Sequence, residues 1–414
     1  MTIAPDQRFC VVPLSVQREG DDFLVGSAEL EEFVQLPDEG VRILTMLREG
    51  TSVPKIAAAF APDDGAGGTA IGETIDVEDF LASMIEIGFV YPEGQADRHA
   101  ERLANAPADR RLVFRANRRV AAAIFSLPSL VVYLLIVGTA IAAAIRYPEA
   151  RIQTDAFFVD NHLAATLVLL LILSSGTTAL HELGHMLAAA AHGVVSRLGF
   201  GMRLWFVVAE ADLSGTMALP KRQRYVPLAA GMMVDVLNIA LITIAVTMLL
   251  RHGVHGFAVA LLQALALQLI VTLLWQFNIF LRTDVYFILC TWFGHPDLDR
   301  DARVYLGAIL SRVSLGRLGR PVGAHVFKSL AMVRAFAAVW VIGRIAALAM
   351  LVLVVLPTLG RYGLKAYRAF ADPAATRATA YDLGIFVILS LLLVAAGLIL
   401  WLRNRPRSTF GEDR

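Results

Sequence analysis

The sequence predicts a mainly α-helical protein, a polytopic bundle of about six transmembrane helices with a small α+β winged-helix domain at its N-terminus. Hydrophobic residues make up 57% of the 414 residues, charged residues only 18%, and the mean hydropathy is +0.61. A soluble chain has a more balanced composition. The first 95 residues differ, because charges and turn signals recur there and no apolar run approaches bilayer length. The predicted division is a winged-helix domain over 1–95, a linker over 96–118, a transmembrane domain over 119–404 and a cytoplasmic tail over 405–414.

The composition also excludes some classes of function. A formal net charge of +1 argues against a nucleic-acid partner, which requires a clustered basic face. Cys10 and Cys290 lie far apart and neither belongs to a CxxC pair, so no disulfide framework is expected. Residues 1–8 lack the basic start and apolar run of a cleavable secretion signal, and we expect this segment to lie in the cytoplasm.

The N-terminal domain is expected to contain short strands followed by helices. Three strands, three helices and a closing strand are expected near 14–18, 23–26, 33–36, 38–48, after Ser52, 76–87 and 89–91. Residues 63–68 are expected to form a glycine-rich loop, and this order of elements is typical of a winged helix.

Six later stretches are long and apolar enough to cross a bilayer, which requires roughly 20 residues each. They lie near 120–145, 163–191, 226–250, 256–280, 335–359 and 380–402. Arginines and lysines gather before the first stretch, after the second, between the fourth and fifth, and after the last. Because cytoplasmic loops carry an excess of such cations, both termini are predicted to face the cytoplasm of a multi-pass cell-membrane protein.

A metal-binding motif lies inside the second apolar stretch. His181-Glu182-Leu183-Gly184-His185 is an HExxH sequence, in which two imidazoles one helical turn apart can hold one zinc ion. The alternative is a hydrogen-bonded pocket of two histidines and a carboxylate without metal. Ionisable groups are costly within a membrane span, by about 2.5–3.5 kcal/mol for a charge, and are usually functional, which favours zinc.

A catalytic zinc site requires a third protein ligand and leaves one position open for water. Asp284 is the candidate, because it directly follows an apolar stretch in which an unpartnered carboxylate is costly. The alternative is a salt bridge between Asp284 and Arg282, and residue chemistry by itself leaves both open.

With these two motifs the chain resembles the site-2 protease type of membrane zinc metalloproteases, and especially its branch of peptide zinc metalloproteases. That family combines HExxH with an aspartate ligand in an NxxPxxxxDG motif, which in this branch often reads NPFLRxDGYY. The matching residues are Asn278, Phe280, Leu281, Arg282, Asp284 and Tyr286. The segment Ala229–Asp235 is similar to the AGPxVD sequence of the branch. The resemblance implies that zinc is held by His181, His185 and Asp284.

The sequence departs from the family pattern at three positions. Gln276 stands where the general motif has Asn, Ile279 replaces its Pro, and Val285 replaces its Gly. Losing Pro and Gly changes the backbone freedom around the ligand, so these departures bear on the local helix break and on activity.

The resulting hypothesis is hydrolysis of a peptide bond, with Glu182 as the general base. Asn278 and Gln276 are candidates for holding the substrate backbone, although hydrogen bonding between helices explains them equally well. Residues 194–215 are expected to form an extended hairpin beside the active helix, with an edge that could bind a substrate strand.

The N-terminal domain is similar in its pattern of elements to the peptide chaperone of pyrroloquinoline quinone biosynthesis, a precursor-peptide recognition element. This resemblance implies capture of a leader peptide at a sheet edge. The function predicted first is maturation or export of a ribosomally made precursor peptide. The alternatives are regulated intramembrane proteolysis of a single-span signalling protein and a non-catalytic transporter or chaperone on the same scaffold.

Overall fold

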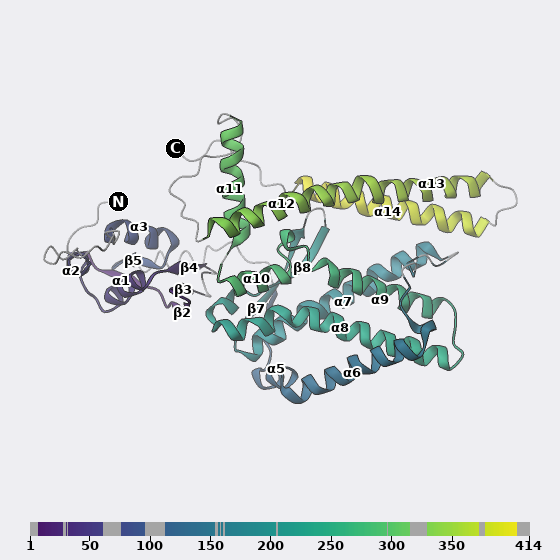
Figure 1. Cartoon of the computed structure of the whole chain (residues 1–414), viewed down its shortest axis with the longest axis horizontal. Coiled ribbons are helices and arrows are strands. Elements are labelled where there is room, and N and C mark those ends of the chain that lie inside the picture. The colour runs from purple at the N-terminus through teal and green to yellow at the C-terminus, as the bar shows by residue number, and fades with distance from the viewer. Residues whose placement is uncertain are drawn as a thin grey trace.

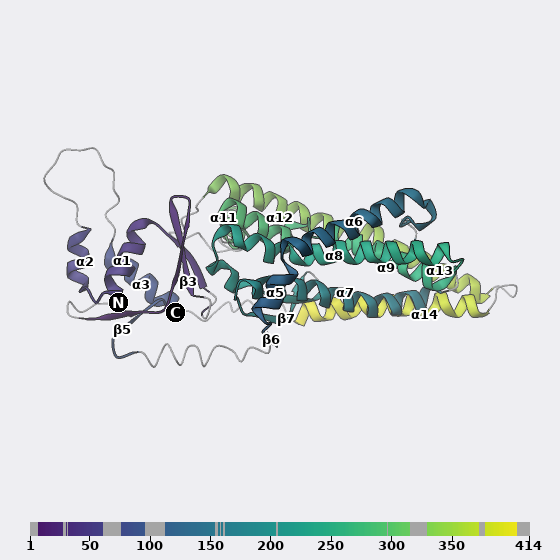
Figure 2. The same cartoon turned by 90° about the horizontal axis from the view of Figure 1, so that it is seen from below.

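The computed structural model places the N-terminal domain at one end of a long molecule and a bundle of roughly aligned helices at the other (Figures 1 and 2). It describes residues 7–403 except 28–29, 31, 61–75, 96–111, 154–155, 158, 160–161, 204–205, 296, 315–328 and 372–376. The loop expected at 63–68 and the tail at 405–414 therefore lie outside the described residues, as does most of the linker.

The N-terminal domain is built from two small sheets packed against three helices. Its elements are β1 (Phe9–Val11), β2 (Ser15–Glu19), β3 (Asp22–Ser27), β4 (Glu32–Leu36), α1 (Asp38–Arg48), α2 (Val53–Ala59), α3 (Val77–Ile87) and β5 (Val90–Pro92). β2, β3 and β4 form an antiparallel meander, and β1 pairs with β5. The side chains of Val25, Ile43, Ile56, Leu81 and Phe89 form the centre of the core. The expected elements are present, and β1 is the addition, because three residues are too few for a periodic pattern.

The bundle confirms the predicted mainly α-helical polytopic fold. Six helical segments are long and apolar enough to cross a membrane, at Leu127–Arg146, Leu163–Ala191, Lys221–Arg251, Phe257–Trp275, Leu330–Leu353 and Arg377–Leu400. The helices involved are α6 (Leu127–Arg146), α7 (Leu163–Ala191), α8 (Lys221–Arg251), α9 (Phe257–Trp275), α12 (Leu330–Met350) and α14 (Arg377–Arg403). Their outward faces remain apolar and exposed, as expected where lipid is the solvent.

Shorter elements connect these spans. They are α5 (Arg118–Ile124), the 3₁₀ turns η1 (Pro148–Ala150), η2 (Ser214–Ala218) and η3 (Ile279–Leu281), α10 (Asp284–Phe293), α11 (Leu298–Val313), the π turn η4 (Leu351–Val355) and α13 (Leu356–Ala371). The first predicted span, 120–145, is interrupted at Phe125 and Ser126. A new helix begins there because Pro128 lies in its first turn, where its missing N–H costs nothing.

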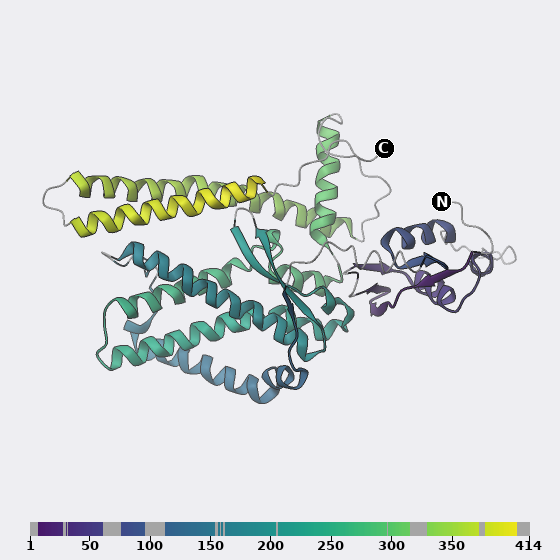
Figure 3. The same cartoon turned by 180° about the vertical axis from the view of Figure 1, so that it is seen from behind.

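A three-stranded sheet crosses the bundle beside α7 (Figure 3). β7 (Ser196–Arg203) and β8 (Phe206–Asp212) form the hairpin expected from the sequence. The strand β6 (Leu112–Phe114), inside the range assigned to a linker, pairs with the outer side of β7. The strand order β6-β7-β8 places β8 at the edge of this sheet.

The helix α7 is anchored at its start by a carboxylate from α14. Asp382 accepts hydrogen bonds from the backbone N–H groups of Leu163, at 2.8 Å, and Ala164, at 3.0 Å. These N–H groups have no partner within the helix, and a negative charge is favoured at that end. The contact holds α7, the helix with the HExxH sequence, against α14.

Candidate metal centre

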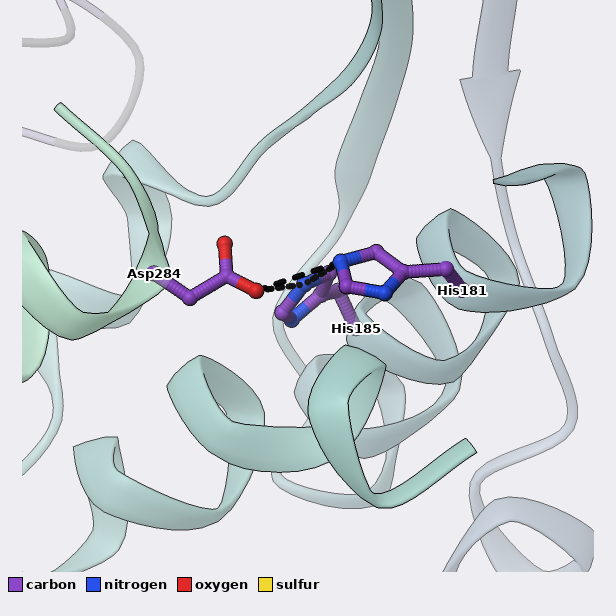
Figure 4. A group of neighbouring side chains, drawn as sticks. All are labelled: His181, His185 and Asp284. Atoms are coloured by element: carbon purple, nitrogen blue, oxygen red, sulfur yellow. Dashed lines mark hydrogen bonds and ion pairs between the residues drawn. The ribbon is translucent and has the colours of Figure 1, made fainter. Parts of the chain in front are cut away.

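Three side chains from two helices converge on one point in the bundle. His181 and His185 lie one turn apart on α7, and Asp284 is the first residue of α10 (Figure 4). The two imidazole Nε2 atoms are 3.1 Å apart. Oδ2 of Asp284 lies 3.1 Å from Nε2 of His181 and 3.2 Å from Nε2 of His185. The three donor atoms therefore form a nearly equilateral triangle.

The size of this triangle suits a metal ion. Ligand distances of about 2.0–2.2 Å and tetrahedral angles separate neighbouring donor atoms by roughly 3.3–3.5 Å. The observed separations of 3.1–3.2 Å are only slightly smaller. These three residues form the group that could hold a metal ion among the residues described. Both histidines are buried, at 6% and 3% exposure.

The second nitrogen of each imidazole is already engaged. Nδ1 of His181 lies 2.8 Å from Oδ2 of Asp235, and Nδ1 of His185 lies 2.7 Å from the carbonyl oxygen of Pro227. Both partners are acceptors, so both Nδ1 atoms donate a proton, and in the neutral rings each Nε2 then carries a lone pair. Two lone pairs facing each other repel unless a cation lies between them. The same outer hydrogen bonds orient histidines in metal sites generally.

Two glycines allow α7 and α8 to approach closely at the site. A Cβ atom at Gly231 of α8 would overlap the Nε2 atoms of both His181 and His185. A Cβ at Gly184 of α7 would lie 2.7 Å from Val234 and 3.1 Å from the backbone of Ala230. A Cβ atom cannot overlap the two Nε2 atoms in this way. The imidazoles therefore occupy their positions only because residue 231 is glycine.

A break in the helical backbone places Asp284 opposite the histidines. α9 ends at Trp275, η3 follows, and Arg282 adopts the left-handed conformation with φ 55° and ψ 47° before α10 begins. Gln276 stabilises this turn, because its side-chain Oε1 accepts from the N–H of Asp284 at 3.2 Å and its carbonyl accepts from Thr283 Oγ1 at 2.5 Å. The break is therefore present although the sequence lacks the Pro and Gly of the family pattern.

The alternative partner of Asp284, the Arg282 side chain, points elsewhere. The Arg282 guanidinium lies 3.9 Å from Asp297 and 4.0 Å from Asp299, beside the rings of Tyr286 and Phe287. The carboxylate of Asp284 instead contacts the two histidines.

Glu182 lies next to the cluster and is held by the hairpin. Its Oε2 accepts a hydrogen bond of 2.7 Å from the backbone N–H of Ala211 in β8. Only 9% of the residue is exposed, and the carboxylate faces the same cavity as His181, His185 and Asp284. A carboxylate fixed through one oxygen keeps the other oxygen available for proton transfer.

The cavity in front of the cluster has a volume of about 530 Å³ and is open to the outside. Its lining comes from α7, the β7–β8 hairpin with η2, α8, the break before α10 with α10 itself, the start of α11, and strands β3 and β4 of the N-terminal domain. The volume is large enough for several residues of an extended peptide, since ligand pockets generally range over about 300–1,000 Å³.

The two residues predicted to hold a substrate backbone fall in different places. Gln276 lines the cavity and also orients Asp284. Asn278 donates to the carbonyl of Trp275 at 3.1 Å and is not among the described residues that line the cavity. The structure therefore brings together His181, Glu182, His185, Asp284 and Gln276, and leaves Asn278 outside this group.

Sequence analysis assigned no role to Asp235, Gly231 or Pro227. Asp235 is only 1% exposed within the apolar helix α8, and its position in a predicted span was a usable signal, because intramembrane carboxylates have partners. Nothing in the sequence indicated that Gly231 faces the imidazoles, since that depends on how two helices cross.

The fold and the site together define a class of protein: a multi-pass membrane protein with a buried His-His-Asp cluster that could hold a metal ion. No protein-family model, curated protein or solved structure matches the chain.

Proposed function

We propose that this chain is an intramembrane zinc metalloendopeptidase of the site-2 protease type. The observation that carries the proposal is the geometry of the cluster. Three donor atoms lie within 3.2 Å of one another, both Nδ1 atoms are engaged, and Glu182 lies beside them in an open cavity. A structural zinc site is closed by four protein ligands, whereas three ligands and an adjacent carboxylate are typical of a hydrolase.

Zinc is the ion that this donor set favours. Two neutral imidazoles and one carboxylate suit a tetrahedral ion, while calcium and magnesium prefer six or more oxygen ligands. When bound by His181, His185 and Asp284, zinc would supply a Lewis acid for the scissile carbonyl group and for water.

Glu182 performs the proton transfers in this proposal. Because Oε2 accepts from Ala211, Oε1 is the atom that takes the proton from water and returns it to the leaving amine. The hydrogen bond also orients the carboxylate, so the backbone of β8 is part of the catalytic arrangement.

The edge of β8 offers a place for the substrate backbone. In an antiparallel strand the N–H and C=O of one residue point to the same side, and alternate residues share that side. The N–H of Ala211 points to Glu182, away from β7, so the backbone groups of Ala209 point outward at the same edge. An extended peptide paired with this edge would lie next to Glu182 with its amide groups accessible.

A ribosomally made precursor peptide is the substrate that we favour, with maturation or export as its purpose. The support is the N-terminal domain, which resembles a precursor-peptide recognition element and lines the metal cavity through β3 and β4. A leader peptide bound at a sheet edge of this domain would lie close to the proposed catalytic residues. We also propose that both termini face the cytoplasm. They are expected on the same side as the connections rich in arginine and lysine, and cytoplasmic loops carry an excess of these cations.

The test is a comparison of purified, detergent-solubilised wild type with the E182Q variant, using elemental analysis and a proteome-derived peptide library. Wild type should contain about one zinc per chain and produce new peptide termini that disappear with a chelator. E182Q should retain zinc and lose cleavage, because only the proton acceptor has changed.

The control is E39Q, which makes the same change at an exposed carboxylate of α1, outside the lining of the cavity. It should retain both zinc and cleavage. Cleavage by E182Q at the wild-type rate would overturn the role of Glu182. A wild-type protein without zinc and without cleavage would favour the non-catalytic scaffold, and cleavage restricted to a co-expressed single-span membrane protein would favour intramembrane signalling.

A further inference from the structure

The N-terminal domain forms one wall of the metal cavity. Leu24 of β3, and Glu32 and Phe33 of β4, line the same space as the HExxH residues, although more than a hundred residues separate them in the sequence. A domain that only recruited substrate would need no side chains at this place. The N-terminal domain therefore contributes three side chains to the space in front of the HExxH residues.

The wall is held in position by polar contacts on both edges of the meander. Gln17 Nε2 donates to the carbonyl of Ala218 in η2 at 3.0 Å. Gln35 Nε2 donates to the carbonyl of Gly294 at the end of α10 at 2.7 Å. Because η2 and α10 flank the cavity, the sheet bridges its two sides.

A buried ion pair adds to this docking. The Glu19 carboxylate, at the tip of the β2–β3 hairpin, pairs with Arg224 Nη1. Their side chains are only 5% and 2% exposed. Arg224 also donates to the Leu219 carbonyl, and it lies in the first turns of α8, the helix that contacts both histidines through Pro227, Gly231 and Asp235. Charged groups are rarely buried without a partner, so undocking exposes or orphans both of them.

The chemistry of the wall is apolar with a negative rim. The Phe33 ring packs onto Gly26, its cross-strand neighbour, because a Cβ atom at position 26 would overlap the ring. Leu24 lies beside it in the lining, and Glu32 is exposed at the end of β4. Such a surface accepts an aliphatic or aromatic side chain and attracts a cation next to it.

We infer that β3 and β4 determine the cleavage specificity of the proposed peptidase, with Leu24 and Phe33 receiving an apolar substrate side chain and Glu32 favouring an adjacent basic one. This inference rests on the proposed function. It assigns the N-terminal domain a direct contact with the substrate near the scissile bond, in addition to any binding of a leader peptide elsewhere on the domain.

The test measures binding of two hydroxamates to the full-length, zinc-loaded protein in detergent. Acetohydroxamate reaches only the metal, whereas a hydroxamate-capped Leu-Arg-Leu amide extends to the cavity wall. F33A should leave the affinity for acetohydroxamate unchanged and weaken the peptide hydroxamate about 10-fold, the effect of losing a partly buried aromatic contact. V16A, on the other face of β2, is the matched control and should change neither affinity.

A second variant tests the charge of the cavity wall and leaves its apolar packing unchanged. E32K should reverse the preference between the Leu-Arg-Leu and Leu-Glu-Leu hydroxamates, because it inverts the charge of an exposed residue. D21N, at the hairpin tip, should keep the wild-type preference.

The possible failures are distinguishable. If wild type does not bind acetohydroxamate, the metalloenzyme proposal itself fails. If wild type binds both probes, and F33A and E32K bind them as wild type does, the metalloenzyme proposal stands and the inference about the wall is overturned.

Discussion

Two carboxylates contact His181, one on each ring nitrogen, and they reach it from different kinds of backbone. Asp235 lies in the middle of the continuous helix α8 and meets Nδ1 at 2.8 Å. Asp284 begins α10 after a broken segment and meets Nε2 at 3.1 Å while also lying 3.2 Å from His185. Asp235 orients one imidazole, whereas Asp284 contacts both.

The difference shows how the position of a residue in its helix determines its role. A side chain in mid-helix projects from a crowded cylinder and reaches one neighbour across the helix contact. A side chain at the first residue of a helix has no preceding turn and can point between two groups. A carboxylate therefore orients one histidine of the candidate site at one place, and at the other it completes the set of three groups that could hold a metal ion. Four predictions test this comparison.

The largest effect is expected for D284A. Losing one of three ligands should reduce metal affinity by more than the roughly 100-fold upper range for an outer partner. Elemental analysis and a competition titration with a chromogenic zinc chelator measure it. D235A in parallel should lose less, and equal losses in the two variants would remove the distinction between ligand and support.

The G231A variant should be the next most severe. The added methyl group overlaps both Nε2 atoms, so α7 and α8 must separate or the imidazoles must turn away. Overpacking of this kind costs typically about 1–3 kcal/mol, and here it also disrupts the donor triangle. Zinc content and the thermal unfolding midpoint should both fall. G176A is the control on α7, where no atom lies within 4 Å of the new methyl group.

A smaller change is expected for D235N, which preserves size and keeps an acceptor for Nδ1. The neutral amide no longer raises the basicity of the imidazole, so zinc affinity should fall by about 10-fold, the lower end for an outer partner. The chelator titration should still reach one zinc per chain at higher free zinc. An unchanged affinity would mean that the Asp235 charge has no part in metal binding.

The smallest effect concerns the backbone before Asp284. R282A and R282G both remove the guanidinium, but only alanine retains a Cβ in the left-handed conformation at φ 55°. R282A should therefore be less stable than R282G by about 1 kcal/mol. Thermal unfolding of the two variants in the same detergent measures this difference. Equal midpoints would show that the broken segment can change its conformation without cost.

The sequence was most informative where structure depends on neighbouring residues. The run of apolar residues from 163 to 191 defined α7, and the four-residue spacing of His181 and His185 placed both on one face. The helix break after residue 275 could not be decided from the sequence, because the Pro and Gly of the family pattern are missing. The structure forms the break with Arg282 in the left-handed conformation and Gln276 bonded across it.

Contacts between distant segments were least predictable. Asp235 could be recognised as an unusual intramembrane acid, but its partner could not be identified without the crossing of α7 and α8. Likewise, the sequence indicates no partner for Glu19, and only the structure pairs it with Arg224.

The amino-acid sequence by itself determined that the chain forms membrane-spanning helices, and it placed two histidines on one face of the second span with a glutamate beside them. Hydrophobic length and helical periodicity suffice for this, since each depends on residues a few positions apart. Only the tertiary structure decided which carboxylate meets which nitrogen, and that β3 and β4 line the cavity. Those features depend on how closely separate elements approach, and that distance is decided by side chains, or by their absence at Gly231, far apart in the chain.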